Sequence, residues 1–308
     1  MKKRKKDVLF HEYFEEWLAL YKVGAIRSIT LEKYYITHQR IIELAPDLHL
    51  SDLNRKNYQR LLNEYALTHE KQTTMDFHHQ IKGAILDAVD EGLIEQNPTR
   101  KIIIKGKEPR KKKPKFLNQY ELQSLLKQLD LKDEVNWDWF ILLIAKTGLR
   151  FSEALGLMPK DFDYFNQSLV VNKTWNYKKA NGEIQPTKNE SSKRKIQIDW
   201  QISMQFSQIT KNMREDKLIF VDGRVFNSTI NNRLAVLCKR ANVPIITIHG
   251  LRHTHASLLL FAGVSIASVA RRLGHSSMTT TQETYLHIIQ ELENQDNDKI
   301  IRHLSALI

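Results

Sequence analysis

The chain has a single cysteine, Cys238, among its 308 residues. No disulfide can form within it, which excludes a small disulfide-stapled scaffold and suits a reducing cytosol. The sequence also lacks an apolar run of the roughly 18 residues that a membrane-spanning helix needs. Its basic start is followed at once by Glu12, Glu15 and Glu16, where a signal peptide would carry an apolar segment. We therefore expect a cytoplasmic protein with no membrane partner.

Glycine and proline are scarce as well, at 11 and 7 residues. The glycine-rich patterns that cradle nucleotide phosphates, GxGxxG and GxxxxGK followed by serine or threonine, are both missing. A lone cysteine also rules out a cysteine cluster that would hold a structural zinc ion. We expect neither a cofactor nor a metal.

Positive charge, in contrast, is in excess. Lys and Arg number 47 against 35 Asp and Glu, a formal net charge of +12. Such an excess can serve solubility alone, but it favours a polyanionic partner such as nucleic acid. A hydrophobic content of 42% over this length is enough for two domains, each with its own core.

The most basic segment, KGKEPRKKKPK at residues 105–115, marks the predicted domain boundary. It has two prolines and no apolar residue, and like charges repel, so we expect an extended linker between domains at 1–104 and 116–308. A solvated tether is one interpretation, and the charge density favours a strap along the phosphates of a polyanion. The candidate binding residues are Lys105, Lys107, Arg110, Lys111, Lys112, Lys113 and Lys115.

The first domain is predicted to be a small helical bundle. Apolar and aromatic residues recur at helical spacing, and capping or stop signals separate four segments. We expect helices at residues 10–22, from Ser28 or Thr30 onward, after Ser51 and Asp52, and at 73–94.

The second domain is predicted to be mainly α with a small antiparallel β-sheet. Asn118 is placed to cap a helix through Leu129, and residues 137–147 are apolar nearly all round, which indicates a buried helix that ends at Gly148. The period then becomes that of strands. Strands are expected at 168–175, 183–187 and 193–198, and helices at 201–213, at 228–240 and from residue 247 onward.

The stretch IHGLRHTHAS at 248–257 fits either a metal site or a phosphate clamp. His249 and His253 share a helical face at a spacing that suits zinc, but the glutamate of HExxH is absent and His255 points elsewhere. Arg252 lies three residues from His249 on one face, and a guanidinium binds phosphate oxygens in a bidentate manner. The residues favour phosphate over metal.

Three further segments carry compatible chemistry. Arg150 follows the buried helix, and Glu153 is placed to pair with its guanidinium and hold its orientation. Lys188 lies in a polar turn between two predicted strands, and His275 precedes Tyr285 by ten residues. Taken singly, each also fits a structural role: an ion pair, one lysine among many, a helix cap and a half-buried tyrosine.

In chain order, TGLRFSE at 147–153, the lysine turn, HGLR at 249–252 and LGHSSMTTTQETY at 273–285 resemble the motifs of the tyrosine recombinase family, the phage-type integrases. The match covers the second half of the chain, and its LGH segment looks especially like integrases of Gram-positive phages and conjugative elements. The first half resembles the family's helical core-binding domain. The resemblance implies a two-domain architecture, with a core-binding domain followed by an α+β catalytic domain.

The resemblance implies site-specific DNA recombination, whether integration, excision or inversion, through a 3′-phosphotyrosyl intermediate that needs no ATP. Tyr285 would attack the scissile phosphate, with His249 as its proton-transfer partner. Lys188 would protonate the leaving 5′ oxygen.

The remaining assigned residues would bind the phosphate itself. Arg150 and Arg252 would clamp the nonbridging oxygens, and His275 would donate a hydrogen bond to the phosphate. The implied partner is a double-stranded recombination site in the bacterial cytoplasm, bound by a homotetramer that is a monomer off DNA. An accessory directionality protein is a further expected partner.

Several positions depart from the family's pattern. Lys188 is followed by asparagine where many members have threonine, so Lys193 stays an alternative catalytic lysine. His253 and His255 receive no role and are interpreted as polar helix residues, with His253 beside the site. Tyr177 is a rival nucleophile, but it lacks the LGH context.

The two ends of the chain also carry expectations. The first helix begins by about residue 8, which leaves no room for the arm-binding domain of many related integrases. We therefore expect either a shortened chain or a compact recombinase. An apolar final helix, carrying Ile300, Ile301, Leu304, Leu307 and Ile308, is expected to pack on its own core or on a neighbouring subunit. The alternatives to a recombinase are a helical DNA-binding regulator without chemistry and a type IB topoisomerase.

Overall fold

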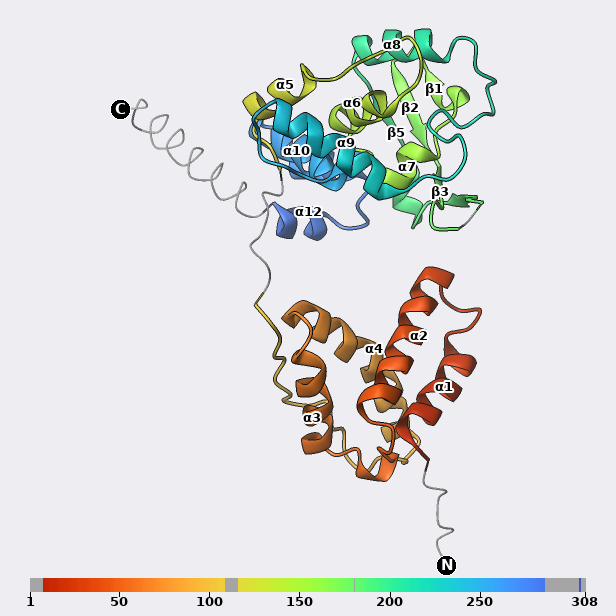
Figure 1. The fold of residues 1–308 in the computed structure, drawn as a ribbon, viewed down its shortest axis with the longest axis vertical. Coiled ribbons are helices and arrows are strands. Elements are labelled where there is room, and N and C mark those ends of the chain that lie inside the picture. The colour runs from red at the N-terminus through yellow and green to blue at the C-terminus, as the bar shows by residue number, and fades with distance from the viewer. Residues whose placement is uncertain (1–7, 109–115, 180, 286–304, 306–308) are drawn as a thin grey trace, which may run out of the picture. The chain divides into compact units, whose positions relative to one another are not determined.

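The computed structural model describes residues 8–108, 116–179, 181–285 and 305. They divide into two compact units, with the division between residues 111 and 112 (Figure 1). Each unit has its own hydrophobic core. Among the described residues, no helix combines the length and the apolar character needed to cross a bilayer.

Unit 1 is the predicted helical bundle. Its helices are α1 (Phe10–Tyr21), α2 (Ser28–Leu44), α3 (Arg55–Ala66) and α4 (Lys71–Asp90). A short 3₁₀ turn at Leu50–Asp52 precedes α3, and Asn54 caps that helix by accepting hydrogen bonds from two backbone amides. Aromatic side chains are prominent in its buried core, so they serve packing.

The described start of the predicted linker lies against unit 1. The backbone amide of Lys107 donates to the carbonyl of His69 at 2.8 Å, and residues 70 and 107 form an isolated β-bridge. Gly106 passes so close to Lys71 that a Cβ atom there would lie 2.2 Å from its backbone nitrogen. Lys105 and Lys107 are exposed, whereas Arg110, Lys111, Lys112, Lys113 and Lys115 lie outside the described residues.

Unit 2 is built around a buried helix, as predicted. Its helices are α5 (Gln119–Leu126), α6 (Trp137–Thr147), α7 (Phe151–Leu155), α8 (Trp200–Thr210), α9 (Asn227–Arg240), α10 (Ile248–Phe261), α11 (Ile266–Leu273) and α12 (Met278–Thr284). Asn118 caps α5 in a capping box with Glu121, although the helix ends at Leu126 rather than Leu129. Helix α10 packs along α6 (Figure 1).

The strands of unit 2 form two small antiparallel sheets rather than one. Strands β1 (Phe162–Asp163), β2 (Ser168–Val171) and β5 (Arg194–Gln197) make the first, in the order β1-β2-β5. Strands β3 (Lys173–Trp175) and β4 (Ile184–Pro186) make the second. The predicted strand 168–175 changes partner at Asn172, because Val171 pairs with Arg194 but Lys173 pairs with Pro186. Pro186 has no N–H to donate, which suits an edge strand.

Candidate active site

Arg150 stands where the buried helix turns into the next one. Gly148 ends α6 in the left-handed conformation, at φ +68°, and Arg150 is the N-cap residue of α7. Its Nη1 donates to Glu153 Oε1 at 2.6 Å and its Nη2 donates to the carbonyl of Gly274 at 2.8 Å. The side chain keeps 28% of its surface exposed, so the guanidinium is fixed and still accessible.

Glu153 is a buried carboxylate that two arginines share. It is 1% exposed, and besides Arg150 it accepts two hydrogen bonds from Arg194, at 2.9 and 3.1 Å. Burial would raise the pKa of this carboxyl, but the hydrogen bonds and charge of Arg194, with help from Arg150, lower it to about 2. Glu153 is therefore ionised throughout the physiological range, as its predicted role of orienting Arg150 requires.

Arg252 lies on α10 and is almost fully buried, at 3% exposure. Its Nη1 donates to the carbonyl of Gly148 at 2.6 Å and its Nη2 to the carbonyl of Leu273 at 2.7 Å. Burial, and next the positive charge of Arg150, lower the pKa of Arg252 to about 9. The structure thus brings the two predicted arginines together, and their mutual repulsion marks a position where an anion would be stabilised.

His275 follows the left-handed Gly274 that ends α11. Its Nδ1 is hydrogen-bonded to the Thr281 hydroxyl at 2.7 Å. Burial, followed by the charges of Arg252 and Arg150, lowers the pKa of the imidazole to about 4. The ring is therefore neutral near pH 7 and lies within the field of both arginines.

Tyr285 is buried in the structure. It is 2% exposed and packs in a small apolar cluster with Ala256, Leu260, Val269 and Leu273. Burial raises the pKa of its hydroxyl to about 12, although Arg252 opposes that shift. The hydroxyl lies 2.9 Å from His253 Nδ1, and the two groups are hydrogen-bonded.

This contact differs from the expected one, which paired the tyrosine with His249. His249 is open to solvent and packs edge-on against the ring of His253, with 4.7 Å between ring centroids. Partial burial lowers the pKa of His249, and the positive charges of Arg252 and Arg150 lower it further. His253 is one helical turn further along α10, which brings it to Tyr285. His249 and His253 are four residues apart on one face of α10, and this spacing could have suggested that His253 rather than His249 contacts Tyr285.

His255 has a structural role that was not predicted from the sequence, where it was interpreted as a polar helix residue. It is buried, its Nδ1 is hydrogen-bonded to the carbonyl of Ala145 at 3.0 Å, and Arg272 Nε donates to its Nε2 at 2.9 Å. Burial, followed by Arg272, lowers the pKa of the ring to about 3. His255 is thus a neutral bridge between α6 and α11, with both ring nitrogens occupied.

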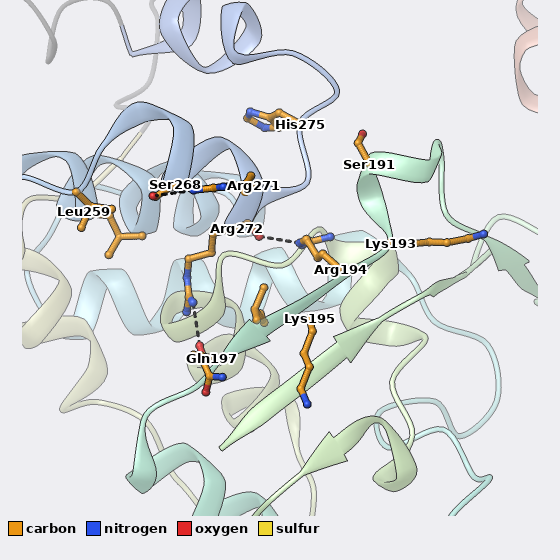
Figure 2. Close-up of a pocket in the computed structure, with 12 residues that line it drawn as sticks. Ser191, Lys193, Arg194, Lys195, Gln197, Leu259, Ser268, Arg271, Arg272 and His275 are labelled. Atoms are coloured by element: carbon orange, nitrogen blue, oxygen red, sulfur yellow. Dashed lines mark hydrogen bonds between the residues drawn. The ribbon is translucent and has the colours of Figure 1, made fainter. Parts of the chain in front are cut away.

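The two candidate lysines lie in the connection between β4 and β5, and both are exposed. Lys193 forms an ion pair with Glu190 at 2.8 Å. It also lines a cavity of about 760 Å³ together with Arg194, Arg272 and His275 (Figure 2). The structure does not distinguish Lys188 from Lys193 as the catalytic lysine, so that choice stays a prediction.

Arg194 also belongs to this site, and it was not predicted from the sequence. It begins β5, and its side chain is 7% exposed. Alternation along a strand places Arg194 on the same face as the buried Ile196, so a cation directed at the core was a readable signal. The rival Tyr177 packs edge-on against Phe151, with 4.9 Å between ring centroids.

The chain is similar in sequence and in fold to known proteins. The sequence profile of the phage integrase family matches residues 115–291. The integrase of Staphylococcus phage L54a is 26% identical over 329 aligned positions, which cover 96% of this chain and 93% of that protein. The Tn1549 transposon integrase, solved in complex with a circular intermediate DNA, superposes with a TM-score of 0.71 at 21% identity, covering 89% of this chain and 94% of that one.

A lambda integrase tetramer bound to a Holliday junction superposes with a TM-score of 0.63 at 18% identity, covering 88% of this chain and 79% of that one. At such identities the superpositions report the shared fold, whereas the profile match spans more than half of the chain. The chain therefore belongs to the phage integrase family of tyrosine recombinases.

Proposed function

We propose that this protein recombines double-stranded DNA at specific sites, cleaving and rejoining strands through Tyr285. The observation that carries the proposal is the convergence of Arg150, Arg252, His275 and Tyr285 in one unit, although 135 positions separate the first from the last. A surface ion pair or a helix cap does not require such a convergence.

The chemistry follows from the groups present. The Tyr285 oxygen attacks the scissile phosphorus, the bond between phosphorus and the 5′ oxygen breaks, and a 3′-phosphotyrosyl bond forms. A lysine of the β4–β5 connection supplies the proton for the leaving oxygen, and a histidine of α10 takes the proton of the tyrosine. Arg150 and Arg252 bind the nonbridging oxygens through their planar guanidinium forks, and His275 donates a hydrogen bond to those oxygens.

Tyr285 must be uncovered before it reacts. A phosphodiester cannot reach a side chain that is 2% exposed, so the described arrangement is a resting one. Its raised pKa also keeps the hydroxyl protonated until a charged phosphate and a proton acceptor are in place. We propose that DNA binding moves the polypeptide around residue 285, which ties cleavage to the presence of a bound site.

The test is covalent capture on DNA. A nicked suicide duplex, taken from the DNA that flanks the gene, traps the adduct because the released strand diffuses away. The unmodified chain should form the adduct, Tyr285→Phe should bind the duplex without forming it, and Tyr177→Phe should form it normally. An adduct from Tyr285→Phe would disprove the nucleophile assignment. No adduct from the unmodified chain would favour a regulator without chemistry.

We propose that the two units and the linker share the binding of DNA. Unit 1 serves as the core-binding domain, and the basic segment 105–115 lies along the phosphate backbone of the DNA. The proposed compartment is the bacterial cytoplasm. When the logarithm of the binding constant is plotted against the logarithm of the salt concentration, each phosphate contact makes the slope steeper by roughly 0.9. Replacing Lys105 and Lys107 with glutamine should therefore lower that slope by about 2. An unchanged slope would remove these lysines from the interface.

We also propose assembly on DNA into four copies, with a single copy in its absence. The lambda tetramer on a Holliday junction, a protein of the same fold, supports this state. Light scattering behind size-exclusion chromatography should give one chain for the free protein and four with paired sites. An accessory directionality protein is a further proposed partner, whose addition should change the ratio of integrated to excised product.

A further inference from the structure

Helix α11 ends with three successive backbone carbonyls, and each accepts a hydrogen bond from a different arginine. The pairs are Arg194 Nε with the carbonyl of Arg272 at 2.7 Å, Arg252 Nη2 with that of Leu273 at 2.7 Å, and Arg150 Nη2 with that of Gly274 at 2.8 Å. The last carbonyls of a helix have no partner within it and carry its partial negative charge. This helix end therefore gathers three guanidinium groups immediately before His275.

Arg194 differs from the other two arginines in how its hydrogen bonds are used. Its guanidinium donates to both oxygens of Glu153, to the carbonyl of Ser192 at 2.9 Å, and to that of Arg272. Figure 2 shows Arg194 reaching from the start of β5 toward Arg272, in the wall of the cavity next to His275. At 7% exposure and with four protein acceptors, Arg194 has little left to offer a phosphate.

Its effect on Arg150 runs through Glu153. With Arg194 in place, each carboxylate oxygen already accepts one hydrogen bond from that guanidinium. Arg150 then needs to give the carboxylate only its Nη1 and its backbone amide, and its Nη2 goes to the carbonyl of Gly274. Without Arg194, Arg150 would be the one ion-pair partner left to this buried carboxylate among the described residues, and the carboxylate would draw the guanidinium of Arg150 toward itself.

We propose that Arg194 is a positioning residue of the active site. It neutralises Glu153 and holds the C-terminal end of α11, so that Arg150 and His275 face the scissile phosphate. The inference rests on the proposed recombinase function and adds to it a residue that never touches DNA. It also links the β4–β5 connection, which bears the candidate lysines, to the two arginines that bind phosphate.

Single-turnover cleavage of the suicide duplex at saturating DNA tests this role. Arg194→Gln should cleave about 100-fold more slowly, since a displacement of about 1 Å at a reacting group can cost that much. Its affinity for the duplex should stay within about twofold, because the side chain is buried. Arg194→Lys, which keeps the charge but not the fork, should recover part of the rate.

A double-mutant cycle separates positioning from general stability. If Arg194 acts through Glu153, then Arg194→Gln with Glu153→Gln should cleave at least as fast as Arg194→Gln alone, because the uncompensated carboxylate is gone. Arg214→Gln is the matched control, since Arg214 also pairs with a carboxylate, that of Asp216, but its side chain is 81% exposed. It should cleave like the unmodified chain.

Two results would overturn the inference. One is Arg194→Gln that cleaves within about twofold of the unmodified chain. The other is a double variant that cleaves more slowly than Arg194→Gln alone. Adduct formation by the unmodified chain and by Arg214→Gln reports separately on the proposed function, so the two failures are distinguishable.

Discussion

Replacing Gly274 with alanine tests whether the end of α11 is as closely packed as the hydrogen bonds imply. Gly274 has φ +67°, and a Cβ atom built on it would lie 2.9 Å from Arg194 Nη1 and 3.2 Å from Arg194 Cδ. Gly263, after α10, has the same left-handed conformation at φ +81° but nothing within 4 Å of such an atom. Alanine at 263 thus measures the backbone cost alone, and alanine at 274 adds the steric cost.

The magnitudes follow from these two contributions. An alanine in the left-handed region costs roughly 1–2 kcal/mol. Crowding a fixed neighbour adds typically about 1–3 kcal/mol, and Arg194 is fixed by four hydrogen bonds. Because a domain of this size loses roughly 2–4 °C of Tm per kcal/mol, Gly263→Ala should lower the Tm of unit 2 by about 3–6 °C. Gly274→Ala should lower it by about twice as much.

Differential scanning calorimetry of the full chain gives the unfolding transition of unit 2 for each variant. Repeating both glycine changes in an Arg194→Ala background supplies the control, since alanine has neither the Cδ nor the guanidinium that the new Cβ would meet. There the two alanines should cost the same. Equal costs in the original chain would refute the reasoning, because the guanidinium would then move aside freely.

Three further predictions concern chemistry and pH. Arg252→Lys should slow cleavage about 100-fold or more at saturating DNA, because one ammonium cannot serve two buried carbonyls and a phosphate. His253→Gln and His249→Gln, compared in the same assay, identify the histidine that accepts the proton of Tyr285. The cleavage rate of His253→Gln should fall roughly 100-fold. If only His249→Gln cleaves more slowly, the contact between His253 and Tyr285 belongs to the resting state alone. Unit 2 should lose stability as pH falls from about 6.5 toward 4, because His255 and His275 have lowered pKa values and only the unfolded chain takes up protons there. His255→Gln should flatten that slope by up to about 1.4 kcal/mol per pH unit; an unchanged melting profile would show that His255 does not titrate on unfolding.

Local signals in the sequence were enough to predict most helices and the motifs that carry the site residues. The apolar run of residues 137–147, its stop at Gly148 and the cap at Asn118 depend on neighbours in the chain, and the structure has all three. Arg150, Glu153 and Arg252 were found because each lies in a short motif with a recognisable spacing. Their mutual contacts then followed from the resemblance rather than from any local rule.

What the sequence did not predict depends on contacts between distant segments. The change of partner at Asn172 needs β4 and β5 to be in place before either sheet exists. The contact of His253 with Tyr285 depends on where α12 returns to α10, 32 positions later. Arg194 was overlooked because Glu153, its acceptor, lies 41 residues away.

The three arginines on the end of α11 also bear on the entropy of DNA recognition. The rotamer entropy of a free arginine side chain amounts to about 2 kcal/mol, and it is lost when the side chain becomes ordered on binding an anion. Here the carbonyls of residues 272–274 impose that ordering while the protein folds. A phosphate would then meet the guanidinium groups of Arg150 and Arg252 already oriented, so more of its binding energy is available for the transition state.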